Sequence, residues 1–96
     1  MGGEIIEMFL AECPKLLQNV RGATEEGNAS KLERAAHALK GSLGDIASPQ
    51  AFEAARTLEM MAREGNIEGA GAPAASLERA MELLEFELRH FERKAA

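Results

Sequence analysis

The sequence has few aromatic residues. It contains no Trp or Tyr, and four Phe residues make up its 4% aromatic content. A core must therefore be built mainly from aliphatic side chains, and hydrophobic residues do account for 46% of the chain. These are chiefly Ala, Leu, Ile and Met, of which Ala, Leu and Met favour helices, and the β-branched and aromatic residues that favour strands are scarce overall. The composition predicts an all-α protein.

Cysteine and long apolar runs are also scarce. Cys13 is the single cysteine, which excludes an internal disulfide and a cysteine-based zinc cluster and agrees with a reducing compartment. We expect Cys13 to be a small residue in the core or at its boundary. No apolar run approaches the roughly 20 residues that cross a bilayer, and no charged-then-apolar leader is present. We therefore expect a cytoplasmic chain with no membrane contact by this domain.

Positive charge is in the minority. Eleven Lys and Arg residues against sixteen Asp and Glu give a net charge of -5, the wrong sign for a domain that binds phosphate backbones, so nucleic acid is not an expected partner. The 96 residues have room for one modest core. We expect a single domain over residues 1–96, and because helical pattern runs to both ends, a segment of a larger sensor kinase is an open alternative.

Proline and glycine divide the sequence into five segments of helical length. We expect a short first helix over residues 4–12, a second that starts at Pro14 and stops at Gly27, and a third that Asn28 caps. Ser48 and Pro49 are expected to cap and begin the fourth, which ends near residues 65–66. Residues 69–73, rich in Gly and Ala, are expected to be a connection before a fifth helix that starts at about residue 74.

Each of the longer segments carries one apolar stripe. In the third segment, apolar residues recur at alternating spacings of four and three: Leu32, Ala36, Leu39, Leu43 and Ile46. No segment alternates with period two, so no strand is expected. Short connections between amphipathic helices place neighbours antiparallel. The expected fold is an up-and-down four-helix bundle with a short additional N-terminal helix.

His37 lies on the side of its helix opposite the stripe. Because each helical residue advances by about 100°, His37 is predicted to face water, and four residues lie within about 60° of it: Glu33, Lys40, Gly41 and Gly44. The two glycines cost about 0.5–1 kcal/mol each relative to alanine inside a helix. The gain expected in return is access, since a helix surface without a Cβ lets another macromolecule reach the ring.

The residues around His37 match part of what a phosphoryl-transfer site requires. A neutral imidazole is a competent nucleophile at neutral pH, and Lys40 supplies a positive charge for an anion held at the ring. The sequence has no glycine-rich ATP loop, no catalytic Asp and Asn pair and no acidic cluster for magnesium. We therefore expect no ATP site and no cofactor of its own.

Other interpretations of the two histidines stay open. An exposed helical histidine is often only a solvated residue, and His90 is expected to be one. A metal site from Glu33 and His37 has the right spacing, but Arg34 occupies the place of the glutamate in the Glu-x-x-His motif of metal-binding bundles. These residues alone leave His37 between a solvated side chain and a reactive one.

The segment AAHALKGS, residues 35–42, resembles the signature of histidine-containing phosphotransfer (HPt) domains. Residues 6–17, 58–66 and 84–91 resemble helices that flank it in that family. The resemblance implies a four-helix bundle in which His37 takes a phosphoryl group from the aspartate of one receiver domain and passes it to another. It implies that the receiver brings the magnesium ion. Lys40 then matches the lysine that favours the phosphoryl charge, and Gly41 matches the glycine that lets the receiver approach.

Some features of the resemblance are left open. Glu59 falls where many members carry Gln or Glu near the histidine, so it either orients His37 by a hydrogen bond or is an ordinary carboxylate at a helix edge. Gly44 has no clear counterpart, and its clearance role rests on the helix geometry alone. Residues 45–48 depart from the common third-helix ending, and residues 69–73 resemble an insertion. Two alternatives are a helical interaction module that is not phosphorylated and the substrate domain of a chemotaxis-type histidine kinase.

Overall fold

The computed structural model describes residues 2–44 and 48–95, with side chains over residues 7–44 and 48–90. It contains four helices, α1 (Gly2–Glu26), α2 (Ala29–Leu43), α3 (Pro49–Arg63) and α4 (Gly71–Ala95). No strand occurs among these described residues. The all-α prediction is confirmed.

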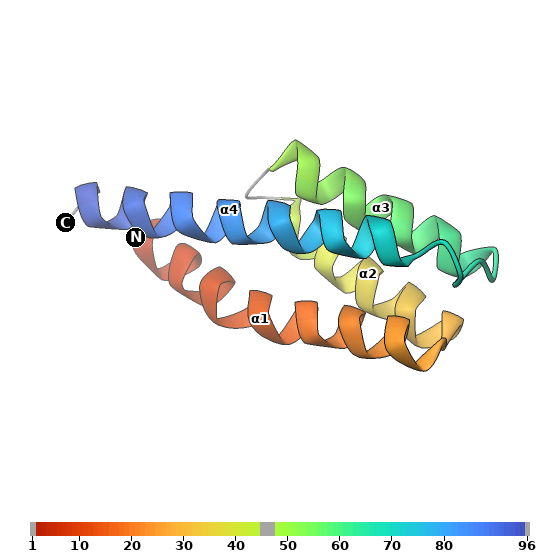
Figure 1. Cartoon of the computed structure of the whole chain (residues 1–96). Helices are drawn as coiled ribbons and strands as arrows, with labels where there is room; N and C mark the ends of the chain where they lie inside the picture. The colour runs from red at the N-terminus through yellow and green to blue at the C-terminus, as the bar shows by residue number, and fades with distance from the viewer. Residues whose placement is uncertain (1, 45–47, 96) are drawn as a thin grey trace.

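The helices form an elongated bundle whose dimensions are 45 × 18 × 18 Å. Each helix packs on two neighbours, α2 on α1 and α3, and α4 on α3 and α1. Figure 1 shows the chain doubling back at every connection, so that its two ends lie at the same end of the bundle. Because α2 and α3 lie directly against each other, side chains from both can meet on one face.

The ends of the middle helices are where the sequence places them. The Asn28 side chain accepts a hydrogen bond from the Lys31 amide (3.0 Å) at the start of α2, and the Ser48 hydroxyl accepts one from the Ala51 amide (3.3 Å) at the start of α3. Gly27 and Gly65 follow α1 and α3 with φ of 67° and 77°, a left-handed conformation that strains residues with a Cβ. Both predicted caps and both predicted stops are confirmed.

The prediction of a separate short N-terminal helix is wrong. Residues 2–26 form one helix with Pro14 inside it. The reason is that the buried side of α1 continues in register through the proline, at the spacings 4, 3, 4 and 3 of Phe9, Cys13, Leu16, Val20 and Ala23. Pro14 itself is exposed, so its ring faces water, and the burial on either side outweighs the lost backbone hydrogen bond. Figure 1 shows α1 bending part-way along its length, as a proline in a helix causes.

The last helix begins earlier than residue 74. It starts at Gly71, and Pro73 lies in its first turn, where a missing N–H costs nothing. Ala70 is fully buried and accepts a hydrogen bond from the Ala74 amide (3.0 Å). Residues 69–73 are therefore split between a connection and the first turn of α4, because Ala70 anchors the connection in the core.

The core draws its side chains from all four helices. Four of the five predicted stripe residues of α2, Leu32, Ala36, Leu39 and Leu43, are fully buried, and Ile46 lies outside the described residues. Cys13 is also fully buried, and burial, followed by the charges of Glu85 and Glu12, raises the pKa of its thiol to about 12. The thiol is therefore protonated and unreactive at neutral pH. No helix among the described residues is long and apolar enough to span a bilayer.

Removing the proline from α1 should stabilise the bundle. Pro14→Ala restores the hydrogen bond to the Leu10 carbonyl, and we expect the free energy of unfolding to rise by about 1–3 kcal/mol, since proline is the least favourable residue inside a helix. Urea unfolding followed by circular dichroism measures the change. A variant less stable than the natural chain would contradict the account given for α1.

Candidate functional site

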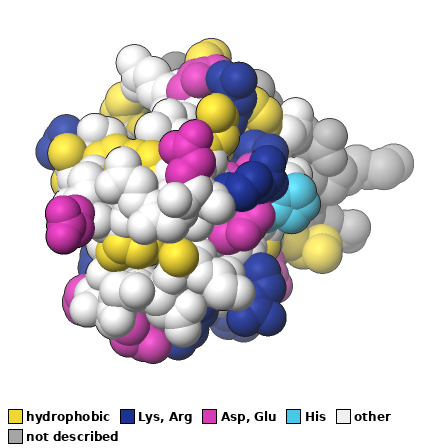
Figure 2. Space-filling view, turned by 90° about the vertical axis from the view of Figure 1, so that its right-hand side faces the viewer, with side chains coloured by type: hydrophobic (Ala, Val, Ile, Leu, Met, Phe, Trp, Pro, Cys, Tyr) yellow, Lys and Arg dark blue, Asp and Glu magenta, His cyan; other side chains and the backbone are white. Residues whose placement is uncertain are grey.

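His37 stands on the outer side of α2. Its side chain is 69% exposed, whereas Ala36 and Leu39 on the same turn are fully buried. The predicted outward orientation of the ring is confirmed. In Figure 2 a histidine side chain is exposed at the surface with acidic and basic side chains around it.

Glu59 on α3 holds the ring from the neighbouring helix. Its Oε2 atom lies 2.7 Å from His37 Nδ1, and its Oε1 atom lies 2.6 Å from Lys40 Nζ. The glutamate side chain is only 5% exposed, and among the side chains that the structure describes it is the single charged group that is buried. Of the two alternatives left open for Glu59, the structure shows the hydrogen bond to His37. A single buried carboxylate therefore ties two residues of α2 to α3.

The charge state of Glu59 decides which ring nitrogen carries the proton. The hydrogen bond from Lys40 lowers the pKa of the Glu59 carboxyl and the hydrogen bond from His37 lowers it further, although desolvation by burial acts in the opposite direction. The group is thus a carboxylate at neutral pH and can only accept hydrogen bonds. We assign the proton of the neutral ring to Nδ1 on this basis. The lone pair of the imidazole is then at Nε2.

Arg63 and Glu33 complete the set of charges, and sequence reasoning missed Arg63. Its Nε atom donates to Glu33 Oε2 (3.0 Å), and its terminal nitrogen donates to Glu59 Oε2 (3.2 Å), the same oxygen that faces the histidine. Arg63 follows Glu59 by one helical turn, so the sequence held a signal for this pair. Placing Arg63 beside His37 and Glu33 also requires the rotation of α3 against α2.

These charged groups border a shallow hollow in the surface. Its lining comes from α2 and α3: Ser30, Glu33, Arg34, His37, Ala38, Glu59 and Arg63. Arg34 has no ion pair among those that the described side chains form. The imidazole therefore faces an open space in which an anion would meet two arginines.

The two glycines beside His37 differ in their structural setting. Gly41 is exposed, and a Cβ placed on it would meet nothing within 4 Å. Gly44 is also exposed, but it is the C-cap of α2, with its amide hydrogen-bonded to the Gly41 carbonyl (3.3 Å). The expectation that Gly44 lies inside the helix without a capping reason is wrong, because α2 ends at Leu43. Of these two glycines, Gly41 is the one that lies inside α2, where glycine lowers helix stability.

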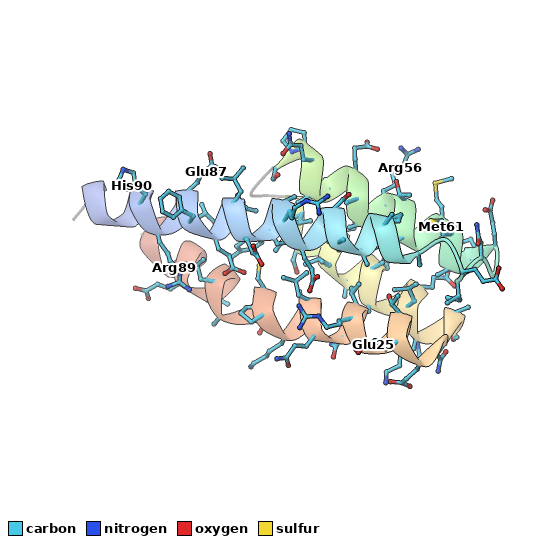
Figure 3. The ribbon with its side chains drawn as sticks, viewed as in Figure 1. Glu25, Arg56, Met61, Glu87, Arg89 and His90 are labelled. Carbon is cyan, nitrogen blue, oxygen red and sulfur yellow. The ribbon has the colours of Figure 1, made fainter. Side chains whose placement is uncertain are left out.

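The second histidine lies apart from this constellation, and Glu33 belongs to it as an ion-pair partner. His90 is exposed near the end of α4, well away from α2, and its ring stacks on Phe86 with centroids 6.2 Å apart (Figure 3). Glu33, the partner in the metal alternative, is bonded to Arg63. Over the side chains that are described, no three His, Cys, Asp or Glu residues cluster as metal ligands would.

The fold and the site together define a class: an all-helical domain that presents one oriented histidine to solvent. A protein-family comparison matches the model of the Hpt domain to residues 4–87. The match covers most of the chain, and the chain belongs to the Hpt domain family. The family implies histidine phosphotransfer in phosphorelays, in which its members interact with receiver domains. Comparisons with curated proteins and with solved structures gave no match.

Proposed function

We propose that this chain, as an up-and-down four-helix bundle, is a phosphocarrier in a multistep two-component phosphorelay. His37 accepts a phosphoryl group from an aspartate of one receiver domain and passes it to an aspartate of another. The hydrogen bond from His37 Nδ1 to the buried Glu59 carboxylate carries this proposal. It leaves Nε2 as the nucleophilic atom on a ring that is 69% exposed, so a partner protein can reach the nitrogen that reacts.

The transfer step follows from this tautomer. The Nε2 lone pair attacks the phosphorus of the aspartyl phosphate, the Nε2–P bond forms, and the P–O bond to the aspartate breaks with its electron pair on the leaving carboxylate. The ring gains positive charge while Nδ1 keeps its proton. Glu59, at 2.7 Å, stabilises that charge and holds the ring in place. The onward transfer reverses these bonds at the second receiver.

Lys40 has two tasks in this proposal. Its Nζ atom keeps Glu59 ionised through the 2.6 Å contact, and its side chain, 27% exposed, is near enough to the surface to favour a phosphoryl group on His37. The magnesium ion that phosphoryl transfer requires is expected on the partner receiver. No nucleotide and no metal of this chain's own is part of the proposal.

The proposal is tested by mixing the chain with a receiver domain that carries labelled aspartyl phosphate. We expect the label to move to this chain in a form that acid removes and alkali does not. A chain that binds receivers but never takes up label would refute the proposal and favour an interaction module. Uptake only when an ATP-dependent kinase domain is joined to the chain would instead favour the substrate domain of a chemotaxis-type kinase.

Gly41 should matter to the receiver and not to the fold. Gly41→Leu places a side chain where nothing lies within 4 Å, so the bundle should gain about 0.5–1 kcal/mol or stay unchanged. Transfer from a receiver should slow by about tenfold or more, because the added side chain keeps the two surfaces apart. Rapid-quench kinetics measures the rate, and Gly41→Ala is the matched control with a smaller loss. Equal rates for all three chains would remove the access role of Gly41.

A further inference from the structure

Arg63 and His37 contact the same oxygen atom. The guanidinium donates to Glu59 Oε2 at 3.2 Å, and His37 Nδ1 lies 2.7 Å from that oxygen. The Nε atom of Arg63 donates to Glu33 Oε2 at 3.0 Å. Arg63 is 62% exposed, so its long side chain has room to change partners. It is therefore an adjustable cation beside the reactive ring.

The charges that are ion-paired beside the unphosphorylated ring cancel. Two carboxylates, Glu33 and Glu59, face two cations, Lys40 and Arg63, and Arg34 lines the same hollow outside these pairs. A phosphoryl group brings about 1.5 to 2 negative charges at neutral pH and three strong acceptor oxygens. That charge exceeds what the set can neutralise while both arginine contacts are kept.

The two carboxylates differ in how easily they release a cation. The Glu33 side chain is 36% exposed, so water can replace the arginine at small cost. The Glu59 side chain is only 5% exposed, and an unpaired carboxylate there would be expensive. When a new anion competes for Arg63, Glu33 is the partner that gives way.

We propose that Arg63 binds the phosphoryl group of phosphorylated His37, and that it does so by leaving Glu33, which occupies the guanidinium in the resting state. Glu33 is thus a stand-in anion that the phosphoryl group displaces. The inference deepens the proposed function and rests on it, because it requires phosphorylation at Nε2 of His37.

The test needs no partner protein. Phosphoramidate phosphorylates exposed histidines directly: the Nε2–P bond forms, the P–N bond of the reagent breaks, and ammonia leaves. The pKa of the resulting phosphohistidine is then read from its ³¹P chemical shift between pH 5.5 and 9. A nearby cation favours the deprotonated form of the phosphohistidine and lowers this pKa, so the titration reports the contact and not the fold.

Three variants define the expected result. Arg63→Gln should raise the pKa of the phosphohistidine and Glu33→Gln should lower it, each by about half a pH unit, and Arg63→Lys should restore part of the effect. In a chain that already carries Arg63→Gln, adding Glu33→Gln should not change this pKa further. Arg56→Gln is the matched control, because Arg56 is an exposed arginine of α3 that pairs with Glu53 (3.4 Å) and lines no part of the hollow. It should leave the titration unchanged (Figure 3 labels Arg56).

The outcomes separate the inference from the function. If His37 is phosphorylated but the Arg63 and Glu33 variants titrate like the natural chain, the inference is overturned and the phosphocarrier stands. If Arg34→Gln raises the pKa and Arg63→Gln does not, the phosphoryl-binding cation is Arg34 and the inference is again overturned. If no phosphohistidine forms at all, both the proposed function and the inference are overturned. A thermal melt of each variant confirms that the compared chains are folded.

Discussion

Glutamine in place of His37 is expected to abolish phosphoryl uptake, both from a phosphorylated receiver and from phosphoramidate. Glutamine keeps a polar side chain of comparable length but has no ring nitrogen with a nucleophilic lone pair. Because the ring is 69% exposed, the free energy of unfolding should change by no more than about 1 kcal/mol, including the lost hydrogen bond to Glu59. The loss should therefore be chemical and not a consequence of unfolding.

The chain contains its own control for this experiment. His90 is the other histidine of the sequence, it is exposed on α4, and its ring is stacked on Phe86 and has no carboxylate bonded to it among the described contacts. His90→Gln should take up label as the natural chain does. Full labelling of the His37 variant, or loss of labelling in the His90 variant, would place the phosphorylated residue elsewhere.

The second large effect is expected at Glu59. Glu59→Ala removes the group that fixes the tautomer and orientation of the ring, and supports of this kind are worth about 10- to 100-fold in activity. Glu59→Gln should lose less, because its amide oxygen can still accept from Nδ1. Initial rates of labelling by phosphoramidate measure the effect without any contribution from docking. Equal rates for the two variants and the natural chain would mean that the 2.7 Å contact has no role in the chemistry.

The same residue predicts how stability depends on pH. The pKa of Glu59 is lower in the folded chain than its ordinary value of 4.5, through Lys40 first and His37 second. A carboxyl of this kind contributes stability that is fully present above 4.5 and is lost as the pH falls through the lowered folded-state value. The stability difference between the natural chain and Glu59→Gln should therefore shrink below pH 4.5. Urea unfolding at pH 7 and at pH 3 tests this, and a constant difference would contradict it.

Local pattern was sufficient for the features that one helix determines alone. The stripe of α2 places Leu32, Leu39 and Leu43 in the core and His37 in water, because a helical period fixes the angle between them. Asn28 and Ser48 mark helix starts because their side chains bond amides three residues ahead. These predictions needed no knowledge of any neighbouring helix.

Features that depend on how two helices pack together could not be predicted from the sequence. Arg63 meets Glu33 across the α2–α3 contact, and the rotation of the two helices decides whether they meet. The sequence predicts a boundary at Pro14 because proline usually ends a helix, but burial of Phe9 and Cys13 before it keeps α1 continuous. In both cases the tertiary packing decided between local alternatives.

The division of the site between α2 and α3 has a practical consequence. The recognisable segment of the sequence, residues 35–42, lies wholly on α2, whereas the carboxylate that sets the ring belongs to α3. A synthetic peptide of α2, or the same residues transplanted onto the surface of another helical protein, would display the histidine, the lysine and the glycine without an oriented ring. Residues 35–42 alone therefore do not carry the orientation of the ring, which exists only while α2 and α3 remain packed together.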